Sequence, residues 1–159
     1  MKIGIVADSH DNVPMIKKAV AFFNQSSVEF VIHAGDYIAP FAVKEFLKLN
    51  VKLIGVFGNN DGEKRGINNL CKEIYEGPRF FNMDGKQFLV VHSLESLDSQ
   101  LEKDADVIVF GHTHESEIRK NGKIYVNPGE CGGWVNGKSS VAIMDSETCE
   151  VEIIDLFAS

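Results

Sequence analysis

Short apolar runs alternate with stretches of helical periodicity over the first two thirds of the chain. Each apolar run is brief and contains β-branched side chains, which favours buried strands over helices. These predicted strands lie at residues 3–7, 30–33, 53–57, 88–91 and 107–110. Between the first two, Asp11-Asn12-Val13-Pro14 offers a capping residue and an early proline, which predicts the start of a helix. Further helices are expected at residues 41–49, 64–75 and about 96–103.

The last third of the chain changes character. Strands are predicted at residues 124–126, 140–144 and 152–157, with no helical pattern between them. Turn signals separate them at Asn127-Pro128-Gly129, Asn136-Gly137 and Asp145-Ser146-Glu147. The chain therefore opens as alternating strands and helices and closes as antiparallel strands. This order predicts a mixed α/β fold with two packed sheets and helices outside, forming one domain over residues 1–159.

The composition is that of an ordinary globular domain. The 159 residues are 44% hydrophobic and 25% charged, which suits a single core and argues against disorder. The formal net charge of −7 argues against a broad basic surface for nucleic acid or an anionic membrane. No run approaches the roughly 20 apolar residues of a membrane span, and Asp8 interrupts the first run too early for a signal peptide.

Cysteine usage sets the expected compartment. Cys71, Cys131 and Cys149 are far apart in the sequence and form no C-x-x-C pair. The sequence therefore predicts neither a disulfide framework nor a cysteine-bound zinc ion. The default location for such a chain is the cytoplasm.

The histidines indicate where chemistry is expected. All five lie within or just past the ends of predicted strands, and none lies in a predicted helix. Aspartate and asparagine residues follow the strands with the same regularity. In open α/β sheets, ligands bind in the crevice beyond the carboxyl ends of the strands. The strand exits read Asp8-Ser9-His10, Gly35-Asp36, Gly58-Asn59-Asn60-Asp61, His92-Ser93 and Gly111-His112-Thr113-His114.

Each of these pieces has an ordinary structural explanation when taken alone. A single Asp-x-His arises by chance, Gly35-Asp36 is a turn signal, and a lone His92 is usually a hydrogen-bonded loop residue. The ordered series on successive strand exits is far more specific than any member, and it predicts a shared metal site. His33 precedes the Gly-Asp pair and is interpreted as a core or supporting histidine.

The ligand types restrict the metal. Imidazole, carboxylate and amide groups without thiolate suit Mn²⁺, Fe, Zn²⁺, Ni²⁺ or Co²⁺ rather than Ca²⁺ or a structural zinc. Two aspartates, one asparagine and three or four histidines are too many ligands for one tetrahedral ion with an open position. Two divalent ions about 3.5–4 Å apart that share one carboxylate would use them all.

At these residues the chain resembles the calcineurin-like metallophosphoesterase superfamily, whose series is D-x-H, G-D, G-N-H-[DE], H and G-H-x-H. The resemblance covers essentially the whole chain and is strongest to the small single-domain bacterial and archaeal phosphodiesterases. It implies a four-layer α-β-β-α sandwich of two mixed sheets with helices outside. It also implies that Asp8, His10 and His114 hold one ion, that Asn59, His92 and His112 hold the other, and that Asp36 bridges both.

Two positions depart from the family pattern. Asn60 stands where the family often has a histidine that assists the leaving group or a phosphoryl oxygen. Asparagine donates hydrogen bonds but is no general acid near neutral pH, so Asn60 is expected to contact the substrate rather than to protonate it. Asp61 is expected to orient a ligand or Asn60. Glu130 stands where a small hydroxyl residue is commoner.

The resemblance implies hydrolysis of a phosphate ester by a hydroxide that bridges two divalent ions, with Mn²⁺ as first choice. Asn59, Asn60, Asp61 and His92 are the expected catalytic set. Without an acid at position 60, a phosphodiester is favoured over a monoester. Arg65, beside Lys64, is a candidate for binding a second phosphate.

Alternatives remain open at this point. A phosphomonoesterase would use the same metal centre. A non-catalytic scaffold of this fold, as in the retromer small subunit, would have a degraded metal site, whereas this sequence keeps every ligand position. The loop at residues 131–137 either shapes the pocket entrance or is a hairpin turn with Trp134 packed locally. The expected partner is a small phosphate ester, with nucleic acid only as a small nucleotide diester, and the sequence allows a homo-oligomer without specifying one.

Overall fold

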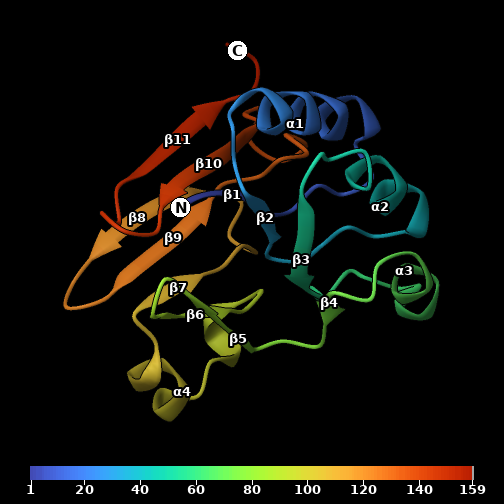
Figure 1. Cartoon of the computed structure of the whole chain (residues 1–159). Helices are drawn as coiled ribbons and strands as arrows, with labels where there is room; N and C mark the ends of the chain where they lie inside the picture. The colour runs from blue at the N-terminus through green and yellow to red at the C-terminus, as the bar shows by residue number, and fades with distance from the viewer. Residues whose placement is uncertain (159) are drawn as a thin grey trace.

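A computed structural model describes residues 1–158 as two facing β-sheets with helices on the outside (Figure 1). The six-stranded sheet has the order β11-β10-β1-β2-β3-β4, and the five-stranded sheet has the order β5-β6-β7-β9-β8. The strands of the first sheet are β1 (Lys2–Val6), β2 (Phe30–His33), β3 (Lys52–Val56), β4 (Ile74–Tyr75), β10 (Ser140–Asp145) and β11 (Val151–Asp155). Those of the second are β5 (Arg79–Met83), β6 (Lys86–Val90), β7 (Val107–Val109), β8 (Ser116–Lys120) and β9 (Ile124–Pro128).

Both sheets are mixed, as predicted. Strands β1 to β4 run parallel, and β10 and β11 add antiparallel neighbours at one side. In the second sheet β6, β7 and β9 run parallel, and β5 and β8 are antiparallel edge strands. The helices are α1 (Val13–Gln25), α2 (Pro40–Phe46), α3 (Lys64–Leu70) and α4 (Ser99–Asp104), with a 3₁₀ turn at Leu94–Ser96.

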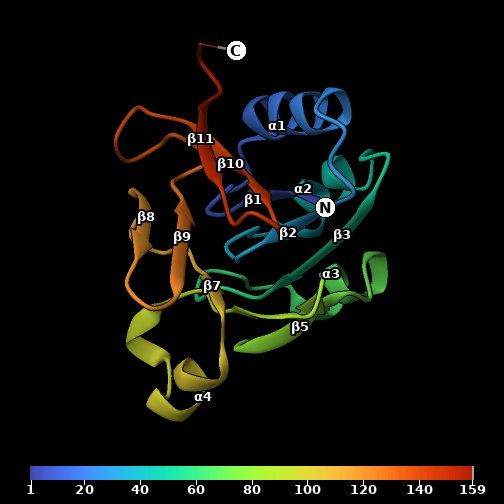
Figure 2. The ribbon, with the colours of Figure 1, turned by 60° about the vertical axis from the view of Figure 1, so that its left-hand side comes forward.

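Three apolar clusters hold the layers together. The first joins α1, α2 and α3 to the outer face of the six-stranded sheet, around residues such as Phe23 and Phe46. The second lies between the two sheets and includes Ile5, Phe88 and Val109. The third packs the region of α4 against the outer face of the five-stranded sheet. Figure 2 shows these layers from the side. The four-layer α-β-β-α sandwich is therefore confirmed.

The first helix begins where the sequence predicted. The Asn12 side chain accepts a hydrogen bond from the Met15 N–H, and a proline occupies the first turn. The Asn12 side chain pairs with a backbone N–H that has no partner inside the helix, and the proline fixes its φ angle near the helical value. No helix within residues 1–158 combines the length and the apolar character needed to cross a membrane.

The predicted helix over residues 64–75 is wrong in its second half. Helix α3 ends at Leu70, and Ile74–Tyr75 forms the short strand β4 beside β3. The Gly55 N–H donates to the Glu73 carbonyl at 2.9 Å, so pairing with a neighbouring strand overrides the local helical pattern. Ile74 is buried in the core against the helices.

Other boundaries differ from the sequence prediction. Helix α2 ends at Phe46 rather than at residue 49, and the segment at 96–103 divides into the 3₁₀ turn and α4. Strands β5 and β8 were not predicted. Both lie at sheet edges, and the side chains of β8 are mostly exposed and polar, so neither carries the apolar run of a buried strand.

Candidate metal centre

The parallel strands of both sheets bring their carboxyl ends to one edge of the molecule. Asp8 follows β1, Asp36 follows β2 and Asn59 follows β3, while His92 follows β6 and His112 follows β7. Two groups of side chains there have ligand atoms within 4.8 Å of one another. The first group is Asp8, His10 and His114, and the second is Asp8, Asp36 and His92.

The first group is built around one buried carboxylate oxygen. Asp8 Oδ1 lies 3.7 Å from His10 Nε2 and 3.7 Å from His114 Nε2. Atoms that share an ion at about 2.0–2.2 Å lie about 3–4 Å from one another, so these distances suit a common metal. Asp8 Oδ1 and His10 Nε2 are buried and have no hydrogen-bond partner within the described chain. Buried polar atoms are rarely left unpaired, so these residues fit a metal ion.

Asp36 lies between the two groups. Its Oδ2 atom is 3.4 Å from His10 Nε2 and 3.4 Å from His92 Nε2, one histidine from each predicted ligand set. Burial by itself raises the pKa of the Asp36 carboxyl, but contacts with His92 and hydrogen bonds from Asn60 bring that pKa well below its ordinary value. Asp36 is therefore an ionised carboxylate that lies between one histidine of each predicted ligand set.

The orientation of His92 leaves one nitrogen available. Its Nδ1 atom lies 2.8 Å from the Ala34 carbonyl oxygen, which can only accept a hydrogen bond. Nδ1 therefore carries the proton of the neutral ring, and Nε2 presents a lone pair toward Asp36. Nε2 is buried without a hydrogen-bond partner in the described part of the chain. A cation between Nε2 and the carboxylate would satisfy both.

The rest of the second predicted ligand set is more open. Asn59 and His112 are exposed, and neither belongs to the two close groups. The His112 ring centre is 5.1 Å from that of His92, and the His112 N–H donates to Asp8 Oδ2 at 3.0 Å. Asn59, His92 and His112 line one hollow of about 470 Å³, together with Lys64 and Ser93. This hollow offers room for a ligand next to the second set.

The family of the chain follows from these residues together with a match along the sequence. Residues 1–149 match the calcineurin-like phosphoesterase superfamily domain. The chain belongs to the calcineurin-like phosphoesterase superfamily. A phosphodiesterase from Methanocaldococcus jannaschii is 37% identical, over 98% of this chain and 99% of that protein. A probable metallophosphoesterase from Methanothermobacter thermautotrophicus is 30% identical, over 97% of this chain and 92% of that protein.

Solved structures agree on the fold. An archaeal phosphodiesterase superposes with a TM-score of 0.89 at 35% identity, covering 98% of this chain and 99% of that one. The Vps29 protein of Entamoeba histolytica superposes with a TM-score of 0.72 at 16% identity, covering 98% of this chain and 99% of that one. The second likeness shows a shared fold alone.

Glycines let the loops of this phosphoesterase close on its carboxylates. A Cβ atom at Gly111 would lie 2.7 Å from Asp8 Oδ2, and one at Gly58 would collide with the Asp36 carboxylate. Side chains at these positions would displace two predicted ligands. Steric exclusion of a side chain therefore explains why the G-N and G-H motifs have glycine at these two positions.

Five predicted ligand residues have left-handed backbone angles. The φ values are 50° at Asp8, 42° at His10, 63° at Asp36, 70° at His112 and 62° at His114. Such angles cost non-glycine residues roughly 1–3 kcal/mol each and persist where the surrounding structure enforces them. The strand exits therefore turn sharply, and five of the ten non-glycine residues with positive φ in the described chain are predicted metal ligands.

Asn60 and Asp61 organise Asp36. The Asn60 side chain donates from Nδ2 to Asp36 Oδ2 at 2.7 Å, and its backbone N–H donates to Oδ1 at 2.9 Å. Buried Asp61 accepts backbone N–H groups from Asp36, Ile38 and Gly58. Burial raises the pKa of the Asp61 carboxyl above its ordinary value, although these hydrogen bonds oppose the change. Both residues thus hold the predicted bridging carboxylate and its loop in position.

The predicted cations do not lie together in the hollow. Lys64 lines it, and its Nζ atom is 3.0 Å from both carboxylate oxygens of Glu76. Arg65 is exposed and is absent from the residues that line this hollow. The structure therefore brings Lys64, rather than Arg65, close to the second ligand set.

His33 belongs to the core that supports the site. It is fully buried, its ring centre lies 3.8 Å from that of Tyr37, and burial lowers the pKa of its imidazole well below the ordinary value. The Gly35 N–H donates to His33 Nδ1 at 3.1 Å, which leaves Nε2–H to donate to Ser9 Oγ at 3.1 Å. His33 is thus a neutral residue that braces the loops carrying Asp8 and Asp36.

Sequence reasoning noted Glu130 as a departure but assigned it no role in the site. The Glu130 side chain is buried, and its Oε2 atom lies 3.3 Å from His114 Nδ1. Trp134 in the following loop is 65% exposed, and its indole N–H donates to the His10 carbonyl at 3.1 Å. Trp134 is therefore held beside a predicted metal ligand, with most of its surface exposed.

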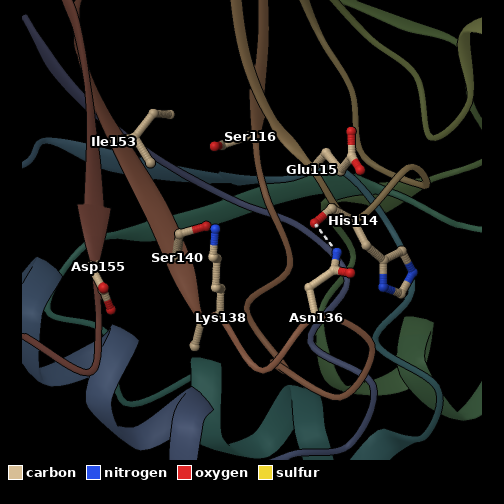
Figure 3. Close-up of a pocket in the computed structure, with 9 residues that line it drawn as sticks. His114, Glu115, Ser116, Asn136, Lys138, Ser140, Ile153 and Asp155 are labelled. Atoms are coloured by element: carbon tan, nitrogen blue, oxygen red, sulfur yellow. Dashed lines mark hydrogen bonds between the residues drawn. The ribbon is translucent and has the colours of Figure 1, made fainter.

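A second hollow, of about 570 Å³, lies on the other side of His114 (Figure 3). Asn136 Nδ2 donates to the His114 carbonyl there at 3.5 Å. The figure shows the His114 imidazole pointing away from Lys138, Ser140 and Asp155, which line this hollow. The hollow therefore adjoins the backbone of His114 rather than the predicted ligand atoms.

Proposed function

We propose that the protein is a phosphodiesterase that uses two divalent metal ions. One observation carries the proposal: Asp36 Oδ2 lies 3.4 Å from a histidine nitrogen of each ligand set. A carboxylate between two sets of imidazoles suits a pair of ions that share it. The names of the relatives from Methanocaldococcus jannaschii and Escherichia coli, both phosphodiesterases, support the same activity.

The predicted ligands form one set for each of two ions. Two ions, when bound, would supply an acidified water for attack and positive charge for the phosphoryl oxygens. We propose Mn²⁺ as the native metal, with Ni²⁺, Co²⁺, Fe and Zn²⁺ as alternatives that the same ligand types accept. Asp8, His10 and His114 would hold the first ion, Asn59, His92 and His112 the second, and Asp36 both.

The surroundings of Asn60 favour a diester substrate. Its side chain donates to Asp36 Oδ2, and an amide supplies no proton to a leaving group near neutral pH. The lack of such an acid favours substrates with good leaving groups, or diesters, whose single negative charge also requires less positive charge at the site. The hollow beside His92 and His112 would hold one ester substituent, with Lys64 at its wall. The substrate class is thus a small phosphate diester.

The test is hydrolysis of bis-p-nitrophenyl phosphate by metal-stripped protein as Mn²⁺ is added back. We expect turnover that saturates at two ions per chain and is lost in His112→Ala. Lys120→Ala, at an exposed position of β8, is the matched control and should behave as wild type. Two bound ions without hydrolysis under Mn²⁺, Ni²⁺, Co²⁺ or Zn²⁺ would contradict the proposal.

A monoester of the same alcohol separates the two kinds of esterase. We expect p-nitrophenyl phosphate to be hydrolysed with a lower kcat/KM than the diester. The reverse order would assign the metal centre to a phosphomonoesterase.

We also propose one metallophosphoesterase domain over residues 1–159 and a cytoplasmic location. The family match over residues 1–149 supports the first. Three free cysteines support the second, because disulfides are rare in the cytoplasm.

A further inference from the structure

Glu130 is a buried carboxylate outside the predicted ligand sets. Its residue is 1% exposed, at the start of the loop that follows β9. Three groups lie close to its two oxygens: the Trp134 N–H, the Val135 N–H and the His114 ring. A carboxylate removed from water is unfavourable unless such partners compensate it. The arrangement therefore needs a structural or functional reason.

The contact with His114 determines which nitrogen faces the metal centre. Glu130 Oε2 lies 3.3 Å from Nδ1, which is buried and makes no hydrogen bond within the described chain, so the pair is in contact without a hydrogen bond. A lone pair on Nδ1 would face the negative carboxylate, so the neutral ring carries its proton there. The lone pair then belongs to Nε2, which lies 3.7 Å from Asp8 Oδ1. A carboxylate behind a metal-binding histidine commonly fixes the ring in this way.

The contacts of Glu130 with the Trp134 loop connect it to His10, the other histidine of the first predicted ligand set. The backbone N–H of Trp134 donates to Glu130 Oε1 at 2.7 Å, and the backbone N–H of Val135 donates to Oε2 at 3.1 Å. The Trp134 indole N–H donates to the His10 carbonyl at 3.1 Å. Glu130 is thus connected to His114 directly and to His10 through Trp134.

We propose that Glu130 is a positioning residue for the first metal ion. It holds His114 in the tautomer and orientation that presents Nε2, and it steadies the backbone of His10 through the Trp134 loop. The inference rests on the metal centre of the proposed function. Its test reads metal binding rather than hydrolysis.

The test is a Co²⁺ titration of the metal-stripped full chain, followed by visible absorbance and by tryptophan fluorescence. Trp134 is the single tryptophan, so the fluorescence reports on this loop alone. We expect Glu130→Gln to weaken the first Co²⁺ step by about 10–100-fold, as is typical when a partner of a metal-binding histidine is lost. We expect Glu130→Asp, which keeps the charge, to recover part of that affinity.

Asn12→Ser is the matched control for loop order. Asn12 Nδ2 donates to the Gly132 carbonyl at 2.6 Å and so anchors the same loop without contacting His114. Serine keeps an oxygen that can cap α1 but lacks the amide donor. We expect this variant to bind the first Co²⁺ within about threefold of wild type, and the melting temperature of each metal-free variant confirms folding.

Two results would overturn the inference. One is wild-type affinity for the first Co²⁺ in Glu130→Gln, and the other is an equal loss in Asn12→Ser. If Glu130→Gln does not fold, the comparison of Glu130→Asp with Asn12→Ser decides: weaker binding in the aspartate variant alone supports the inference, and equal binding overturns it. Wild-type protein that binds two Co²⁺ ions without hydrolysing a diester contradicts the proposed function and leaves this inference standing.

Discussion

The two halves of the predicted metal centre differ in how completely the protein forms them. The side chains of His10 and His114 are 18% and 16% exposed and face Asp8 Oδ1. In the other half Asn59 and His112 are exposed, and only His92 has a side-chain ligand atom grouped with those of Asp8 and Asp36. Side chains already held in place lose less freedom when they bind. The first predicted ion site is therefore preorganised, whereas the second is open to the hollow beside it.

The largest effect is expected where the halves meet. Asp36→Ala removes the carboxylate between His10 and His92. We expect metal content to fall from two ions to at most one per chain, and kcat/KM to fall by at least about 1,000-fold, because charge stabilisation of the phosphoryl group is lost. Elemental analysis and diester kinetics measure both.

Asp104→Ala, at an exposed position of α4, is the matched control for loss of an aspartate. An Asp36→Ala variant that keeps two ions and most of its activity would show that the halves work separately.

A pair of histidine variants tests the difference in preorganisation. We expect wild-type protein to bind Mn²⁺ in two steps of unequal affinity. His10→Ala should remove the tighter step, because His10 belongs to the enclosed group around Asp8. His112→Ala should weaken the second step by at least about tenfold and leave the first step unchanged. Calorimetric titration separates the steps. Loss of the weaker step in His10→Ala, with the tighter step weakened in His112→Ala, would show that the second half is the preorganised one.

A smaller effect is expected from the residue that holds the shared carboxylate. Asn60→Ala removes a 2.7 Å hydrogen bond to Asp36 Oδ2. Hydrogen bonds to charged groups contribute about 1.5–3 kcal/mol, so we expect kcat/KM to fall by about 10–100-fold. Asn69→Ala, on the exposed side of α3, should leave kinetics unchanged. Unchanged kinetics in Asn60→Ala would mean that the loop holds Asp36 without this contact.

The smallest effect is expected on the pH dependence of folding stability, through His33, which supports the loops of both halves. Burial keeps the pKa of His33 well below 6.5, so as pH falls the unfolded chain takes up this proton before the folded one does. Stability should therefore fall below about pH 6.5, with a slope contribution of at most about 1.4 kcal/mol per pH unit. Urea unfolding of metal-stripped protein at several pH values, compared with His33→Gln, isolates this contribution. An equal slope in both proteins would show that His33 takes no part.

The fold was predictable wherever burial leaves a pattern in the sequence. Strands β1, β2 and β3 are continuous apolar runs because other layers cover both of their faces. The edge strand β8 has polar, exposed side chains and left no such pattern. The two residues of β4 are too few to overcome the helical signal that precedes them.

The candidate site was predictable as a set of residues but not as a set of contacts. Parallel strands must deliver residues such as Asp8 and Asp36 to one edge, so their meeting follows from topology. The hydrogen bonds of Asn60 to Asp36 and the contact of Glu130 with His114 depend on loop conformations. Those loops turn through left-handed angles, which remain uncommon at aspartate and histidine and so could not be assigned from the sequence.

The left-handed angles at five predicted ligands also bear on the stability of the metal-free protein. Glycine would adopt these angles without steric penalty, so stability alone would favour glycine at positions such as 112 and 114. This chain instead has aspartate or histidine at all five positions. These five backbone angles therefore lower the stability of the metal-free protein, and a bound cation would offset that loss by favouring the folded chain.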